Sequence, residues 1–200
     1  MKYLIISIFI LISKLVISQD SLTINYNNVS NQNYYQLTEL LPNAKNNNFW
    51  EFLFDLAVIE SNGNWLAING QYIGLWQMGK LSRIESIYYG NNYFNDYTLY
   101  NFTKNDFIKN PYIFNIKIQK KYICYYIISI QNIMSDHILK YNNKIINNIK
   151  ITKSGIIASS HLVGVNNVKK YLDSNGKFIP TDGNNVSLER YMILFNDYNF

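Results

Sequence analysis

The amino-acid sequence predicts a mainly helical α+β domain with a small β-hairpin, and three observations lead to this prediction. Of the 200 residues, 48% are hydrophobic and 16% are charged, which suits one sizeable core and argues against disorder. Apolar residues recur at helical spacing, first over residues 49–60 and then through much of the chain. Asn69-Gly70 lies between two short apolar runs and is a strong signal for a hairpin turn.

The start of the chain resembles a secretory signal. Lys2 supplies a positive charge, the apolar run Leu4–Ile12 follows, and Val16-Ile17-Ser18 suits a cleavage site. We therefore expect a signal peptide at 1–18 and an exported mature protein, in the periplasm, in the cell envelope or secreted. An uncleaved membrane anchor is the alternative. Lys14 limits the apolar run to less than the ~20 residues that span a bilayer, which favours cleavage and no stable membrane span afterwards.

The mature chain divides into two parts. Residues 19–48 are rich in asparagine, with one apolar interruption at Leu37–Leu41, and we expect a leader that lies over the domain. Residues 49–200 are expected to form the domain itself. Beyond the first helix, helical patterns and caps predict further helices over 81–89, 106–141 with a break at Asn110-Pro111, 155–162, 165–172 and 187–195.

The first predicted helix of the domain separates its carboxylates. Glu60 shares a face with Leu53 and Leu56, at spacings of seven and four residues. At ~100° per residue, Asp55 is ~140° and Glu51 ~180° away from Glu60 around the helix axis. We therefore expect Glu51 and Asp55 to face water and Glu60 to lie on the apolar side.

A carboxyl group in apolar surroundings has a specific chemical use. Burial penalises its charged form and raises its pKa, so that the acid can donate a proton near neutral pH. Protonation of a glycosidic oxygen commonly needs such a group. The alternative for Glu60 is structural, as a helix-end carboxylate held by backbone amides or by a lysine.

The residues around Glu60 resemble a known family. Glu60-Ser61 after an apolar helix, followed by the run Gly74-Leu75-Trp76-Gln77-Met78, resembles the glutamate-serine and Gly-Leu-Met-Gln motifs of lysozyme-like lytic transglycosylases, with Trp76 replacing the usual Met. Other segments resemble the secreted and phage-borne branch of that superfamily. They are Asp106-Phe107 with Asn110-Pro111, residues 152–172, and Thr181-Asp182-Gly183-Asn184 followed by Tyr191 and Phe195. The resemblance covers residues 49–200.

This resemblance implies a lysozyme-like fold in which the helices and the hairpin line a substrate cleft. It also implies cleavage of the β-1,4 bond between N-acetylmuramic acid and N-acetylglucosamine in peptidoglycan, with Glu60 as the catalytic residue. The substrate-binding residues that it implies are Ser61, Trp76, Gln77, Met78 and His161. Among them, Ser61 would hold the glutamate and Gln77 would bind an N-acetyl group. His161 takes the position of a family tyrosine that lies close to the glutamate.

Structural roles remain open for these residues. Trp65 and Trp76 could stack on sugar rings, but core packing is the alternative for at least one of them. Ser61 could instead cap a helix end, and Gln77 could be a polar residue at the end of a hairpin. For His161 the structural role is that of a core histidine between Ile157 and Val165.

The number of carboxylates bears on the type of reaction. Glycoside hydrolysis ordinarily needs a second carboxylate. Asp96, Asp106, Asp173 and Asp182 are available, but no motif demands any of them, and Asp182 is explained as a turn residue. Lytic transglycosylases use a lone glutamate and form a 1,6-anhydro sugar, so we favour a transglycosylase over a hydrolytic lysozyme or muramidase. A non-catalytic cell-wall-binding protein that retained the fold is also possible.

Other chemistries find little support. With two histidines, one cysteine and no HExxH spacing, we expect no metal and no cofactor. Cys124 is alone, so no intramolecular disulfide can form, and its neighbours indicate a buried thiol. Ser159-Ser160-His161 lacks a nucleophile elbow. We assign His137 to the surface.

The net charge of +5 is a weak clue to the partner. Lysine supplies most of the positive charge, without a basic block or an RNA-binding aromatic pattern, so we expect no nucleic acid. The expected partner is the peptidoglycan glycan strand, which is an anionic polymer, and the expected state is a monomer.

Overall fold

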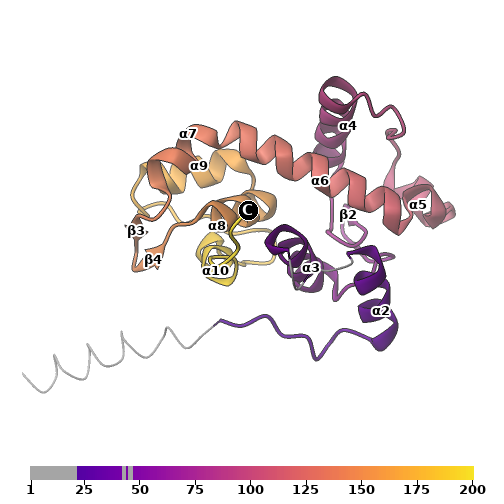
Figure 1. Cartoon of the computed structure of the whole chain (residues 1–200), viewed down its shortest axis with the longest axis horizontal. Helices are drawn as coiled ribbons and strands as arrows, with labels where there is room; N and C mark the ends of the chain where they lie inside the picture. The colour runs from indigo at the N-terminus through magenta and orange to yellow at the C-terminus, as the bar shows by residue number, and fades with distance from the viewer. Residues whose placement is uncertain (1–21, 42–43, 45–46) are drawn as a thin grey trace, which may run out of the picture.

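The computed structural model describes residues 22–41, 44 and 47–200, so the expected signal peptide at 1–18 lies outside the described residues. The described chain is mainly helical with two small β-hairpins, which confirms the mainly α class predicted from the sequence (Figure 1). Within these residues, no helix combines the length and the apolar character that crossing a membrane requires.

From residue 48 onward the helices follow the predicted order, except that the stretch after Asn110-Pro111 is divided into three helices and not one. The described helices are α2 (Asn31–Leu40), α3 (Asn48–Ser61), α4 (Lys80–Phe94), α5 (Lys104–Lys109), the 3₁₀ helix η3 (Pro111–Phe114), α6 (Ile116–Ile133), α7 (Ser135–Tyr141), α8 (Lys153–Val163), α9 (Val165–Asp173) and α10 (Leu188–Leu194). The predicted break at Asn110-Pro111 separates α5 from η3, because proline begins a helix easily but cannot continue one.

Helix α6 runs through the middle of the molecule and organises the core (Figure 1). It packs against α4 towards one end of the molecule and against α8 towards the other. Its buried face consists of Gln119, Tyr122, Ile123, Ile127, Ser129 and Ile130. The expected leader adds to the same core, because Leu37 and Leu41 are almost fully buried.

The two hairpins differ in how well the sequence predicted them. The predicted hairpin pairs β1 (Ile68–Asn69) with β2 (Tyr72–Ile73) in antiparallel register. The second pairs β3 (Ile145–Ile146) with β4 (Ile149–Lys150), where the sequence predicted no strand. Its turn uses Asn147 and Asn148, both at positive φ. Asparagine tolerates this conformation, which a two-residue hairpin turn of type I′ requires at both positions, so the Asn-Asn pair was a missed signal.

Helix α3 is held at both ends. The Asn47 side chain accepts hydrogen bonds from the backbone N–H groups of Phe49 and Trp50 and caps its start. The helix ends at Asn62, which is left-handed with φ 52°, and Gly63 follows with φ 71°. A Cβ atom on Gly63 would lie 2.8 Å from Cδ1 of Leu37, so only glycine lets α2 pack this closely on the end of α3.

Asp55 corrects one expectation from the helix pattern. The residue was expected to face water, but it is 6% exposed and accepts hydrogen bonds from the hydroxyl groups of Tyr26 and Tyr198. Burial raises the pKa of Asp55, and the two tyrosine hydrogen bonds oppose that rise. The N-terminal segment before α2 and the C-terminal tail after α10 both cover this face of α3. Helical periodicity alone cannot show that a distant segment returns to cover a polar face.

We predict that Asp55→Ala lowers the free energy of unfolding by about 2–4 kcal/mol, because two buried tyrosine hydroxyls lose their acceptor. Urea denaturation of the full chain measures the loss. Glu51→Ala is the matched control, because Glu51 lies on the same helix but the two tyrosines donate to Asp55 and not to it, and it is expected to cost less than about 1 kcal/mol. Equal losses in the two variants would contradict a stabilising role for Asp55.

Candidate functional site

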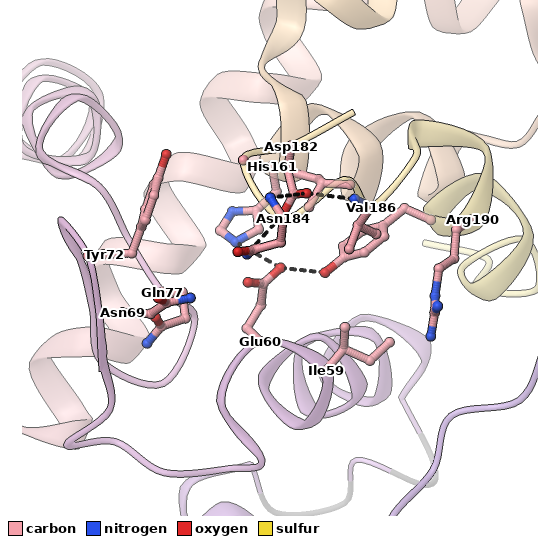
Figure 2. Close-up of a pocket in the computed structure, with 14 residues that line it drawn as sticks. Ile59, Glu60, Asn69, Tyr72, Gln77, His161, Asp182, Asn184, Val186 and Arg190 are labelled. Carbon is pink, nitrogen blue, oxygen red and sulfur yellow. Dashed lines mark hydrogen bonds and ion pairs between the residues drawn. The ribbon is translucent and has the colours of Figure 1, made fainter. Parts of the chain in front are cut away.

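A cavity of about 580 Å³ lies where separate segments of the chain meet. Its walls come from the end of α3, the β1–β2 hairpin, the end of α8, and the loop that leads into α10 (Figure 2). The titratable side chains that line it are Glu60, Tyr72, His161, Asp182, Arg190 and Tyr191. A concave site with converging polar groups is the usual form of a ligand-binding site.

Glu60 points into this cavity from the last turn of α3 (Figure 2). Its side chain is 13% exposed, and its Oε1 accepts a hydrogen bond of 2.8 Å from the Tyr191 hydroxyl. Nε2 of His161 lies 3.7 Å from the same oxygen. Tyrosine and histidine thus surround the carboxyl, where the structural alternative expected backbone amides or a lysine.

The environment of Glu60 favours its protonated form. Burial raises the pKa of Glu60 to about 7, the hydrogen bond from Tyr191 opposes the rise, and the negative charge of Asp182 adds to it. At neutral pH, a substantial fraction of the molecules thus carries a proton on Glu60. A carboxylic acid in this state can serve as a general acid.

His161 lies beside Glu60, as expected, and forms part of the cavity wall. Its side chain is 5% exposed, and its ring makes an edge contact with Tyr126 at 5.9 Å between centroids. Burial lowers the pKa of His161 to about 4, and the nearby backbone of Trp76 offsets this only in part. The imidazole is hence neutral near pH 7 and places no positive charge next to Glu60.

Ser61 binds backbone carbonyl groups next to the site. Its hydroxyl lies 3.1 Å from the Ala57 carbonyl oxygen and 2.7 Å from that of Leu75, and it can donate to either. The contact with Leu75 ties the end of α3 to the segment that carries Gln77. Ser61 does not line the cavity, so its position supports the helix-end role and not substrate contact.

A buried amide on α6 fixes the same segment from the other side. Oε1 of Gln119 accepts from the backbone N–H of Leu75 at 2.6 Å, and its Nε2 donates to the carbonyls of Trp65 and Phe114. A Cβ atom on Gly74 would lie 2.5 Å from this Oε1, and φ of Gly74 is 80°. Glycine is therefore required here for the approach of the amide.

Gln77 reaches the cavity because of its own backbone conformation. Its φ is 44°, and its side chain, in a residue that is 8% exposed, lines the cavity. Nε2 donates to the Gly74 carbonyl at 2.8 Å, with a longer contact of 3.4 Å to Ala67. Oε1 has no hydrogen-bond partner among the described residues. This oxygen is also almost fully shielded from solvent, so the amide carries an unpaired acceptor buried in the cavity wall.

Trp76 and Met78 correct two expected substrate contacts. Both are only 1% exposed and belong to the hydrophobic core. Nε1 of Trp76 donates to the Leu53 carbonyl at 2.8 Å, which satisfies the indole inside the core. The positive φ of Gln77 sends its side chain to the cavity while its two neighbours point inward. The sequence of the motif alone does not show which of its side chains the turn at Gln77 directs to the cavity.

Trp65 also lies away from the site around Glu60. It is half-buried, contacts Tyr112 at 6.1 Å between ring centroids, and lines a different cavity beside Tyr112 and Lys117. Stacking of Trp65 on a sugar bound at Glu60 is therefore not supported by its position.

Of the four aspartates considered as a second carboxylate, Asp182 lines this cavity and the other three do not. Asp96, Asp106 and Asp173 hold local networks outside this cavity: Asp96 binds Lys121, Asp106 closes the capping box of α5, and Asp173 binds His137. Asp182 is a turn residue, as predicted, because its Oδ1 accepts from the backbone N–H groups of Asn184 and Val186. It also lines the cavity, which the sequence did not predict.

Tyr191 contacts Glu60 directly and is a further site residue that the sequence interpretation missed. It follows Glu60 by 131 residues, and helical spacing explains it equally well as a core residue of α10. The only available signal was its place in the closing segment that resembles the transglycosylase branch.

Metal and thiol chemistry have no candidate centre in the part of the chain that the structure describes. No group of three or more histidine, cysteine, aspartate or glutamate side chains there could hold an ion. Burial raises the pKa of Cys124 to about 11, which keeps the thiol protonated and unreactive.

In comparisons with protein-family models, curated proteins and solved structures, nothing matches this chain.

We predict that Tyr191→Phe raises the pKa of Glu60 further, because the ionised carboxylate loses the hydrogen bond that stabilises it. Carbon-13 NMR of the glutamate carboxyl groups across a pH titration measures the change. Tyr198→Phe is the matched control, since Tyr198 donates to Asp55 and should leave Glu60 unchanged. A pKa that stays constant or falls in Tyr191→Phe would contradict this arrangement.

Proposed function

We propose that this chain cleaves peptidoglycan glycan strands at the β-1,4 bond between N-acetylmuramic acid and N-acetylglucosamine, as a lytic transglycosylase with Glu60 as its acid. The observation that carries this proposal is the carboxyl of Glu60, which faces a cavity, has a pKa of about 7, and takes its hydrogen bond from a tyrosine. The family resemblance around Glu60-Ser61 supports it, and we propose a lysozyme-like fold with a substrate cleft on the same grounds.

The first step is proton transfer to the leaving group. Glu60 donates its proton to the glycosidic oxygen, the bond from that oxygen to C1 of the muramic residue breaks, and the 4-hydroxyl of N-acetylglucosamine is released. The acetamido oxygen of the muramic residue assists at C1. Neutral His161 suits this step, because an imidazolium at 3.7 Å would stabilise the carboxylate, lower the pKa of Glu60 and leave less of it protonated near neutral pH.

The second step returns the proton to Glu60. The carboxylate takes the proton of the muramic 6-hydroxyl while O6 bonds to C1, which gives the 1,6-anhydro product. The hydroxyl of Tyr191 steadies the carboxylate in this state, because it donates to Oε1. No water molecule is consumed, so one carboxyl group suffices for the cycle.

Substrate binding would use Gln77 after its side chain rotates, because its unpaired Oε1 is shielded from solvent in this conformation. Its Oε1 can accept the N–H of an acetamido group, the feature that distinguishes N-acetyl sugars from plain ones. The cavity of about 580 Å³ lies within the ~300–1,000 Å³ typical of ligand sites. We further propose that the chain works as a monomer outside the cytoplasm, after removal of residues 1–18.

We predict that Glu60→Gln abolishes cleavage, with a loss of at least about 100-fold, because glutamine keeps an acceptor for Tyr191 but has no acidic proton. Turbidity loss of purified peptidoglycan gives the rate, and mass spectrometry identifies anhydro products. Glu39→Gln is the matched control, since Glu39 is exposed and lies outside this cavity. If wild type and Glu60→Gln bind peptidoglycan equally and neither cleaves it, the chain is a non-catalytic wall-binding protein.

We predict that the cleavage rate falls as pH rises through about 7, because Glu60 must be protonated to act and its pKa is about 7. Well above that pH the rate should drop about tenfold per pH unit. Initial rates measured at constant ionic strength define the profile. A rate that rises through this range would show that the ionised form of Glu60 is the active one and would overturn the general-acid role.

A further inference from the structure

Asp182 shares the cavity with Glu60 but belongs to a different wall. Glu60 projects from the end of α3, and Asp182 comes from the loop that leads into α10 (Figure 2). They are the two carboxylates that line the cavity among the described residues. They are near enough for the charge of Asp182 to act on the protonation of Glu60.

The loop holds the carboxylate of Asp182 in one orientation. Its Oδ1 accepts from the backbone N–H of Asn184 at 2.9 Å and from that of Val186 at 2.7 Å. The loop is closed again by the backbone bond from Asp182 N–H to the Val186 carbonyl, at 3.0 Å. Two bonds to one oxygen prevent the carboxylate from turning, so the position of the other oxygen is also set.

The second oxygen of Asp182 is available for chemistry. Within the described part of the chain, the hydrogen-bond contact of Oδ2 is a long one, 3.4 Å from Nδ2 of Asn184. A carboxylate oxygen can accept more than one hydrogen bond, so Oδ2 retains acceptor capacity. The cavity therefore contains one carboxyl in apolar surroundings and one in a polar, hydrogen-bonded loop, the contrast that assigns acid and base roles in glycosidases.

We propose that Asp182 is a general base that activates a water molecule in this cavity, so that the chain also hydrolyses the bond that it cleaves. This inference rests on the proposed function, since it uses Glu60 as the proton donor. The oxygen of the water bonds to C1 of the muramic residue, and Oδ2 of Asp182 takes its proton. Glu60 gives its proton to the leaving oxygen as the glycosidic bond breaks. One water is added per bond, and a reducing muramic end forms in place of the anhydro end.

The other polar groups of the cavity are less suited to this role. Burial lowers the pKa of His161 to about 4, which makes the ring a weak base, and the hydroxyl of Tyr191 already donates to Glu60. Arg190 is a cation, and burial of Tyr191 together with the charge of Glu60 keeps its phenol protonated.

The test compares wild type with Asp182→Asn, because asparagine keeps an oxygen that can accept from Asn184 and Val186 while losing the base. Both proteins digest purified peptidoglycan in water labelled with heavy oxygen, and mass spectrometry counts labelled reducing ends and unlabelled anhydro ends. We expect the ratio of reducing to anhydro ends to fall at least about tenfold in the variant. Azide, which needs no deprotonation, should take the place of water in Asp182→Asn and yield a glycosyl azide in place of the lost reducing ends.

A purely structural role of Asp182 predicts a different result. Loss of the loop would lower both products together and leave their ratio unchanged, which would overturn the proposal. The pH midpoint of anhydro formation adds a second measure, since removal of the negative charge near Glu60 should shift it to lower pH. Asp173→Asn, outside the cavity, is the control for the loss of an aspartate. Anhydro ends alone from wild type would overturn this inference but not the proposed function, whereas no cleavage by wild type would overturn both.

Discussion

The hydrogen bond from Tyr191 to Glu60 is the constraint on which the site depends, because it joins the first helix of the expected domain to its last. The bond can form only if α10 approaches α3 closely, and α8 provides the surface on which α10 rests. Ser154 and Ser159 on α8 donate to carbonyls of Phe195 and Leu188. Hydroxyl groups on α8 thus help to position α10, and with it Tyr191, which donates to Glu60 on α3.

The opposite wall is built around one buried amide and one hydroxyl. Gln119 on the central helix satisfies three backbone groups, and Ser61 binds the carbonyl of Leu75 from the end of α3. Buried hydrogen-bond networks of this kind are stabilising when every member is paired, and they restrict the backbone strongly. The conformation of the turn then presents Gln77 to the cavity with one acceptor unpaired among the described residues. Rigid support behind a partly unsatisfied group is what a preorganised binding site needs.

Helix α3 carries two carboxyl groups, Asp55 and Glu60, that differ in their hydrogen bonds and in their access to the cavity. Asp55 accepts two tyrosine hydrogen bonds and links both ends of the described chain to the helix. Glu60 accepts one and keeps a face open to the cavity. Burial raises the pKa of both groups, and only Glu60 is placed where a ligand can reach it. Accessibility, not burial, is what separates the structural acid from the candidate catalytic one.

The sequence by itself determined the mainly helical class, the turn at Asn69-Gly70 and the position of Glu60 at the end of an apolar helix, because these follow from local spacing and from residue conformational preference. Tertiary structure alone decided that Asp55 is buried, that Trp76 enters the core and that Tyr191 reaches Glu60. The first and third outcomes depend on a segment that is distant in the sequence and packs against the side chain. The second depends on the backbone conformation of the turn next to Trp76. Periodicity describes one element at a time, and a site formed between elements is invisible to it.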